Sequence, residues 1–292
     1  MIEAFDNHMA TIFLSSWAIY LDESMSIWNN RWKCPDWIFC WRKTHPFGNE
    51  YHTACCALSD ILFVIKIIEG KDCPRDLGRQ EFDNLGGKTV GLLLRMLKSY
   101  FATGKYVILD LGFCVLKGLI ELRKRELFAC ALIKKHHYWP INVPGNKIDR
   151  VFAEDGVKMS DTNDVQGVQD SITYNLWGMK EPNYVMKVMV TGGSLLSNNS
   201  CKEAVHKWVE DGVKVVKKFR YALPFNWHFR YCHAVDDHNN LHHHTPSIEE
   251  TCKTDRWEYC VFAFIIALSK VKSFLAIRFF KKPPEMPTLV IF

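Results

Sequence analysis

Three aspartates, far apart in the chain, are the residues best suited to chemistry. Asp22 and Asp110 each follow a short apolar run, at residues 17–21 and 106–109, and Asp236 lies much later. A short apolar run bounded by turn residues predicts a buried strand, and open α/β folds bind their ligands beyond the carboxyl ends of strands. An isolated aspartate after a strand more often only caps the next helix, so the chemical interpretation requires that the three side chains converge.

Converging carboxylates would need cations between them. Two carboxylates at about 4 Å repel by roughly 4 kcal/mol at an effective dielectric constant near 20. Oxygen donors with open coordination positions suit Mg²⁺ or Mn²⁺, and two such ions about 4 Å apart can support cleavage of a phosphodiester. The chain carries no Ser-His-Asp or Cys-His signature, which agrees with a mechanism that needs few other protein groups.

The composition indicates a folded protein with a real core. The 292 residues are 48% hydrophobic and 24% charged, enough for one large domain or two ordinary ones. The net charge of +5 permits an anionic partner such as DNA without demanding one.

The 11 cysteines are scattered through apolar segments, with neither a signal peptide nor a C-x-x-C pair. They predict free thiols in a reducing compartment rather than disulfides or a zinc module. The longest apolar run, residues 261–268, is far shorter than the ~20 residues that span a bilayer. We therefore expect a soluble, intracellular protein with no membrane partner.

The elements before residue 136 come in the order β-β-β-α-β-α-β. The predicted strands are residues 17–21, 52–58, 61–69, 106–109 and 127–134, and the predicted helices are residues 89–101 and 115–126. Residues 58–60 form the expected turn of a hairpin within an antiparallel meander. This is the element order of an RNase H-like domain, whose first and fourth strands are neighbours, so that Asp22 and Asp110 would face each other.

A polar stretch then interrupts the pattern. Strands are expected within it at residues 172–178, 184–190 and 215–221, since ~90 structureless residues are improbable in a compact fold. A helix carrying Asp236 and a final apolar helix at residues 255–280 follow. The fold class is therefore α/β: an RNase H-like mixed sheet flanked by helices, with a β-rich insertion between the second and third acids. The predicted domains are a lead-in remnant at 1–16, the core at 17–135 and 230–282, the insertion at 136–229 and a tail at 283–292.

At this point four segments in order resemble the piggyBac-type DDE transposases and the proteins derived from them. The resemblance covers roughly residues 17–280. It rests on the motifs Tyr20-Leu21-Asp22-Glu23-Ser24-Met25, Leu109-Asp110-x-Gly-Phe, Val235-Asp236 and Arg256-Trp257, with Asn30-Arg31, Arg42-Lys43 and Phe47-Gly48 between the first two. Two of the smaller motifs depart from the family, which usually has Gly-Arg at the first and Lys-Pro where this chain has Lys43-Thr44.

The resemblance implies an RNase H-like catalytic core that acts on DNA in the nucleus. It implies metal-dependent strand cleavage and transfer, hairpin intermediates and a preference for TTAA targets, with a homodimer as a possible assembly. By residue match, Asp22, Asp110 and Asp236 would be the catalytic residues and the ligands of Mg²⁺ or Mn²⁺.

Departures from the family leave a second function open. The family often has a further acid three residues after the third one, where this chain has Asn239. Only 21 residues precede Asp22, and nothing like the family's Cys-rich domain follows Phe280. These departures suggest a core-only fragment, either a degenerate copy or a truncated gene model, and the alternative function is that of a domesticated, non-catalytic DNA-binding protein. A soluble interaction protein without a nucleic acid role is the least favoured class.

Two basic and aromatic segments are candidates for DNA contact. The residues in question are Arg31, Lys33, Arg42 and Lys43 in the first segment and Lys134 and Lys135 in the second. Tryptophans interleave with the first four, and an aromatic pair follows the last two. Basic groups can bind the phosphate backbone and aromatic rings can stack on bases. Ordinary surface segments have the same composition, so both interpretations stand.

The run His242-His243-His244 offers ligands for a metal ion. Consecutive histidines cannot all face one ion on a helix, and no cysteine lies at ligand spacing. A solvated polar loop is therefore the favoured interpretation of this run.

Overall fold

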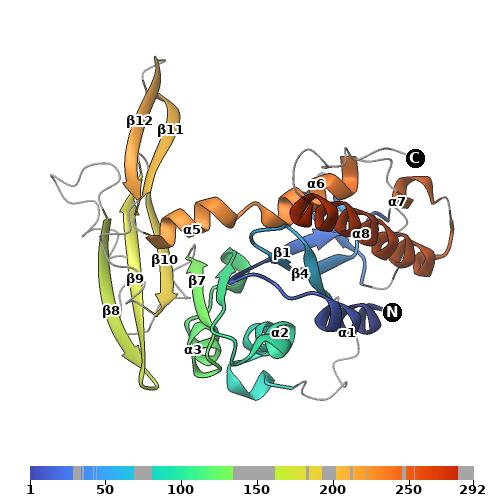
Figure 1. Ribbon diagram of the computed structural model, residues 1–292, viewed down its shortest axis with the longest axis horizontal. Coiled ribbons are helices and arrows are strands. Elements are labelled where there is room, and N and C mark those ends of the chain that lie inside the picture. Colours follow the sequence, from blue (N-terminus) through green and yellow to red (C-terminus); the bar gives the residue numbers. More distant parts are fainter. Residues whose placement is uncertain are drawn as a thin grey trace. The chain divides into compact units, whose positions relative to one another are not determined.

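The computed structural model describes two compact units, of which one comprises Met1–Gln80 and His233–Phe292 and the other Glu81–Cys232 (Figure 1). The described residues are 1–28, 34, 36–41, 43, 45–68, 81–133, 162–181, 184–192, 202–210, 213–221, 223–244, 248–252 and 254–281. Both units contain helices and strands, so the chain has a mixed α/β fold, as expected. The predicted domain boundaries stay a prediction.

The first unit is built on an antiparallel sheet in the order β5-β4-β1. Its strands are β1 (Ala18–Met25), β4 (Glu50–Cys56) and β5 (Leu62–Ile67). The turn before β5 contains Asp60, whose φ of 56° is left-handed and whose amide donates to the Cys56 carbonyl at 2.9 Å. The predicted meander and its hairpin turn are confirmed.

The aspartate of the first strand does not lie at its end. Leu21 was the predicted last residue, but β1 continues to Met25 because Glu23, Ser24 and Met25 keep pairing with β4. Seven of the eight residues of the strand are buried, and Glu23 is half-buried. Asp22 is therefore a mid-strand residue, and the predicted strand end is wrong.

The loop after β1 contains a short hairpin that the sequence did not predict. It is formed by β2 (Ile38–Phe39) and β3 (Phe47–Gly48). Gly48 has a φ of 155°, and a Cβ at this position would overlap the backbone oxygen of Ser26. Glycine is required here because the chain returns from the hairpin in direct contact with the end of β1.

Helix α1 (Ile2–Ile12) covers the outer edge of the sheet (Figure 1). Asp6 accepts a hydrogen bond from the amide of Ile65 at 2.9 Å and pairs with Lys66 at 3.1 Å. An edge strand with unpaired amides tends to aggregate, and this side chain occupies one of those amides. The residues predicted as a lead-in therefore form a helix packed against β5.

Helix α8 (Trp257–Phe280) is the long core helix of the first unit. Its Phe264 stacks on Tyr51 of β4, with ring centroids 4.5 Å apart. By length and composition alone the helix could cross a membrane, but half of its most apolar window is buried inside the protein. The predicted terminal helix is confirmed, and its buried side packs within the first unit.

In the second unit, β6 (Tyr106–Leu109) and β7 (Phe128–Leu132) pair in parallel and are joined through helix α3 (Leu116–Lys124). Helix α2 (Lys88–Leu97) packs on α3 and continues into a short 3-10 helix, Lys98–Tyr100. Four predictions are confirmed here: the two strands and the two helices, with boundaries shifted by a few residues.

The inserted stretch is rich in strands, as predicted. It contributes β8 (Thr162–Gln169), β9 (Ile172–Lys180), β10 (Val185–Thr191), the hairpin of β11 (Lys202–Glu210) and β12 (Val213–Tyr221), and then helix α5 (Leu223–Tyr231). The antiparallel order β7-β10-β9-β8 extends the sheet of this unit. Strands β8 and β11 were not predicted, because neither has enough apolar residues to reveal a strand.

An ionic network connects the β8–β9 turn to helix α3. Asp170 in the turn pairs with Lys117 and Lys124, each at 2.8 Å. Glu121 between these lysines is 4% exposed and pairs with Arg125 at 2.7 Å. The inserted strands are thus tied to the helix that follows Asp110.

Candidate functional site

Asp22 is a buried carboxylate held by its own backbone. The residue is 8% exposed, and its Oδ1 accepts a hydrogen bond from the Glu23 amide at 2.8 Å. Thr53 lies directly opposite on β4 and donates from its hydroxyl to the Asp22 carbonyl at 3.1 Å. A carboxylate oriented in this way is presented in a defined direction on one face of the sheet.

Helix α6 (Ala234–His244) carries the third acid and packs on β1 and β4. Asp236 is exposed in its first turn, where the helix dipole favours a negative charge. The helix is confirmed as predicted, and Asp236 and Asn239 share one of its sides because they are three residues apart.

A hydrogen bond joins this side of α6 to the face of β1 that carries Asp22. Ser24 Oγ donates to Asn239 Oδ1 at 2.9 Å, and Asn239 Nδ2 approaches the Glu23 carbonyl at 3.5 Å. Ser24 and Asp22 point to the same face because side chains alternate along a strand. The first unit therefore brings the first and third acids onto two faces that are hydrogen bonded to each other.

Asp110 belongs to the second unit. It directly follows β6 and precedes the 3-10 helix Leu111–Phe113, whose last amide bonds to the Asp110 carbonyl at 3.1 Å. Its carboxylate makes no capping hydrogen bond to that helix. The capping interpretation is therefore wrong for Asp110, and its partly buried carboxylate is available for another role.

One basic candidate for DNA contact can be placed. Lys43 donates from Nζ to the carbonyl of Glu23 at 3.0 Å, close in the chain to Asp22. The others lie outside the described residues: Arg31, Lys33, Arg42, Lys134 and Lys135.

The sequence did not single out the buried residues that fix α6. His238 is fully buried, and its Nδ1 lies 3.0 Å from the carbonyl of Asp60 in the β4–β5 turn. Burial lowers the pKa of His238 to about 3, which keeps the ring neutral. Burial, together with the nearby charge of Asp237, raises the pKa of Asp60 to about 6. The sequence does not reveal this contact, because the partner of His238 is a backbone carbonyl, which every residue has.

The histidine run is not a solvated loop. His242 and His243 belong to α6, and His242 is 1% exposed. Its Nε2 lies 3.0 Å from Oε2 of Glu249 in α7 (Ile248–Thr251), with both side chains fully buried. The favoured interpretation of this run is wrong, because the His242 ring is buried inside the protein next to the Glu249 carboxylate.

The comparisons with known families agree with this arrangement. The family model described as Transposase IS4, a DDE transposase domain, matches residues 1–274. The chain belongs to this transposase family. No curated protein matches it.

A solved structure shows the same fold. It is the cryo-EM structure of the piggyBac transposase synaptic complex with hairpin DNA, which superposes with a TM-score of 0.62 at 12% identity. The similarity covers 94% of this chain and 49% of the piggyBac chain, so this chain spans about half the length of that relative. The resemblance to piggyBac transposases is therefore confirmed for the fold, while the family shown is that of the Transposase IS4 model.

Proposed function

We propose that this chain is the catalytic core of a piggyBac-like transposase that cleaves and transfers DNA strands with the help of Mg²⁺ or Mn²⁺. The ligands would be Asp22, Asp110 and Asp236. The observation that carries the proposal is the hydrogen bond between Ser24 and Asn239, since it joins the strand of the first acid to the helix of the third.

The donor set suits hard divalent cations. All three residues offer carboxylate oxygens, which is the donor type that Mg²⁺ and Mn²⁺ prefer. Bound ions of this kind supply activation of an attacking oxygen and stabilisation of a leaving one. Two observations support this assignment: Asp236 is exposed, and the Asp110 carboxylate makes no capping hydrogen bond to the helix that follows it.

The residues of this chain have separable tasks in the proposal. Asp22 is oriented by the Glu23 amide and can bind without rearranging. Asp236 lies where the α6 dipole lowers the cost of its charge. Asn239 holds the helix on the strand through Ser24, so that the two acids keep their positions while DNA binds and leaves.

The partner in this proposal is DNA. The solved relative is named as a synaptic complex with hairpin DNA. By analogy we expect this chain, an RNase H-like core with a β-rich insertion, to act on transposon ends and TTAA targets in the nucleus and to do so as a homodimer. The basic residues named above, from Arg31 to Lys135, are the proposed backbone contacts.

A second function has one observation in its favour. Asn239 replaces an acid that the family often has, and an amide is a weaker metal ligand than a carboxylate. A domesticated DNA-binding protein that no longer cuts would tolerate this change. The two functions differ in a single measurable property, which is cleavage.

The test is a nicking assay on purified protein with a duplex that contains TTAA. We expect nicks with Mg²⁺, none with a chelator, and none from Asp110→Ala, which should still bind the duplex. Asp164→Asn, an exposed carboxylate of the same unit, is the matched control and should cut like the unmodified protein. Equal cutting by Asp110→Ala would exclude the proposed mechanism, while binding without any cutting would favour the second function.

A further inference from the structure

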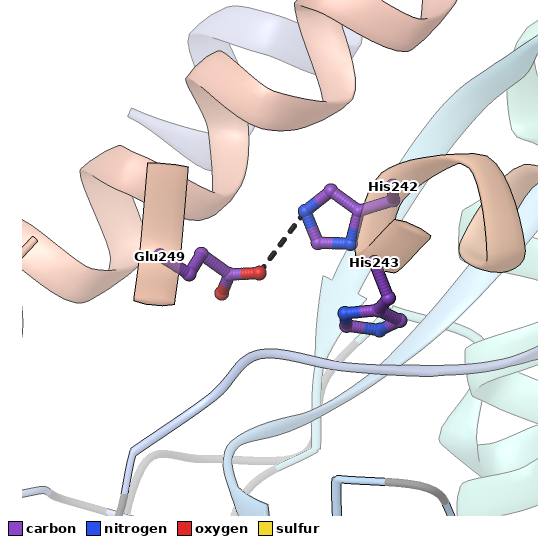
Figure 2. Close-up of side chains that lie close together, drawn as sticks. All are labelled: His242, His243 and Glu249. Atoms are coloured by element: carbon purple, nitrogen blue, oxygen red, sulfur yellow. Dashed lines mark ion pairs between the residues drawn. The ribbon is translucent and has the colours of Figure 1, made fainter. Parts of the chain in front are cut away.

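We propose that His242, His243 and Glu249 form a second metal site, specific for Zn²⁺ and separate from the three aspartates. One ligand atom from each of the three residues lies within 4.8 Å of the others. Figure 2 shows the two histidines at the end of α6 and the glutamate of α7 gathered in one place. The site belongs entirely to the first unit.

The central pair has the separation of two ligands on one ion. His242 Nε2 and Glu249 Oε2 lie 3.0 Å apart. Zn²⁺ binds histidine nitrogen and carboxylate oxygen at about 2.0–2.2 Å, so two such ligands at a tetrahedral angle are about 3.3 Å apart. The existing pair therefore needs almost no movement to hold an ion, and the ligand atom of His243 needs a shift of up to about 1.5 Å, which a side-chain rotation can supply.

The buried groups are not satisfied by hydrogen bonds. Within the described residues, neither ring nitrogen of His242 has a hydrogen-bond partner, and Oε2 of Glu249 has none. The short distance between them lacks the alignment of a hydrogen bond. Because buried polar atoms are usually hydrogen bonded, two such groups facing each other point to a missing third atom between them.

The carboxylate is held in place from its other side. Oε1 of Glu249 accepts a hydrogen bond from the Ile27 amide at 3.1 Å. Ile27 follows the end of β1, so the glutamate connects α7 to the strand that carries Asp22. A second partner that orients a ligand is typical of protein metal sites.

A pocket borders the glutamate of the proposed site. A pocket of about 390 Å³ is lined by Glu249, His45 and Cys252 among others. The rings of His45 and His243 are 4.6 Å apart. Three protein ligands with the fourth position open to a pocket is a common arrangement for Zn²⁺.

The ligand types select the ion. Imidazole nitrogen suits Zn²⁺, whereas Mg²⁺ takes oxygen ligands. An ion here would fix the C-terminal end of α6 to α7 and, through Ile27, to β1. It would thereby stabilise the helix that carries Asp236 without touching the reacting groups.

The test is a Zn²⁺ titration of metal-free protein, monitored by competition with a chromophoric chelator, in excess Mg²⁺ to saturate the carboxylates. Glu249→Gln and His242→Gln should each weaken the tightest Zn²⁺ binding by at least about tenfold. His8→Gln, an exposed histidine of α1, should bind as the unmodified protein does. Zn²⁺ should also raise the Tm of the unmodified protein but not that of Glu249→Gln.

Unchanged Zn²⁺ affinity in both variants would overturn the proposal and leave an ordinary buried His-Glu pair. Circular dichroism checks that each variant is folded. If either variant fails to fold, the absorption spectrum of Co²⁺ bound to the unmodified protein tests the proposal instead. A tetrahedral spectrum without a thiolate charge-transfer band supports these ligands, and a thiolate band places the ion on cysteines and contradicts the site.

Discussion

Ser24 on β1 and Asn239 on α6 are hydrogen bonded at 2.9 Å, although 215 positions separate them in the chain. Ser24 is fully buried and also lies 3.1 Å from the Thr53 hydroxyl. This short chain of side chains connects β4, β1 and α6. It holds the helix that carries the third acid against the strand that carries the first.

Removing the Ser24 hydroxyl should destabilise the first unit. Ser24→Ala leaves the buried side of Asn239 without its donor, which typically costs about 1–3 kcal/mol. Urea unfolding followed by circular dichroism measures the change in the free energy of unfolding. Ser269→Ala, which removes an exposed hydroxyl on α8, is the control and should change it by less than about 0.5 kcal/mol. A loss no larger than that of the control would show that the bond does not hold α6.

Restoring an acid at position 239 should strengthen metal binding. In Asn239→Asp the Ser24 hydroxyl still has an acceptor, and a fourth carboxylate joins the acidic group. The new charge also faces the Glu23 carbonyl, so the metal-free protein should become less stable. We expect about tenfold tighter Mn²⁺ binding by calorimetry together with a lower Tm without metal. Unchanged Mn²⁺ affinity would mean that position 239 does not face the metal.

Lys272 on α8 should reduce stability at neutral pH. The side chain is 7% exposed, its Nζ lies 3.3 Å from the centroid of the Phe5 ring, and burial lowers its pKa to about 7. The unfolded chain keeps the proton up to about pH 10.5. Between pH 7 and 10.5 the unfolded state therefore binds more protons, and stability rises with pH.

Lys272→Met should remove this dependence. Methionine keeps the apolar contact with Phe5, so the variant should be more stable at pH 7 by on the order of 2–4 kcal/mol, with a flatter pH profile up to pH 10. Denaturant unfolding at several pH values, with reductant present, measures both. Lys270→Met on the same helix is the control. A variant that is less stable at pH 7 would show that the contact of the charged amine with the ring outweighs its burial.

Glu121 should stabilise the second unit only when it is ionised. Burial raises its pKa, but hydrogen bonds from Arg125, Lys124 and Lys117 together outweigh burial and lower it. Its contribution is therefore present above about pH 4.5, the unfolded value, and is lost as the pH falls through the folded pKa.

Glu121→Gln tests this contribution. At pH 7 we expect a loss of about 1–2 kcal/mol, below the 3–5 kcal/mol of fully buried pairs because the cations are partly exposed. Near pH 3 the difference between the variant and the unmodified protein should be smaller than at pH 7. Hydrogen exchange should also show weaker protection of the β8–β9 turn. An equal loss at both pH values would assign the effect to packing instead of charge.

The sequence predicted most elements whose apolar residues repeat with a clear period. Strands β4, β5, β6 and β9 and helix α8 are where they were expected, since each buries an apolar run. It failed at β8 and β11, whose polar residues hide the strand period. It also ended β1 too early, because Asp22 looked like a terminus while its pairing with Thr53 continues the strand.

The candidate site could be predicted only in part. The three acids stood out because each lies in a motif of the family. The Ser24–Asn239 bond and the burial of His242 against Glu249 depend on contacts between distant segments, which no local pattern records. The division of the acids between the units could not be predicted from a local pattern either: Asp22 and Asp236 belong to one unit and Asp110 to the other.

The most direct test of the account compares Mn²⁺ binding by three proteins that all carry Glu249→Gln, which excludes the histidine site. One has no further change, one also carries Asp22→Asn and one also carries Asp110→Asn. If carboxylates from both units share one metal centre, either variant should lose at least about tenfold in Mn²⁺ affinity, as measured by electron paramagnetic resonance of the free ion. Full Mn²⁺ binding by Asp110→Asn, with loss only in Asp22→Asn, would contradict a shared centre and with it the proposed DNA cleavage.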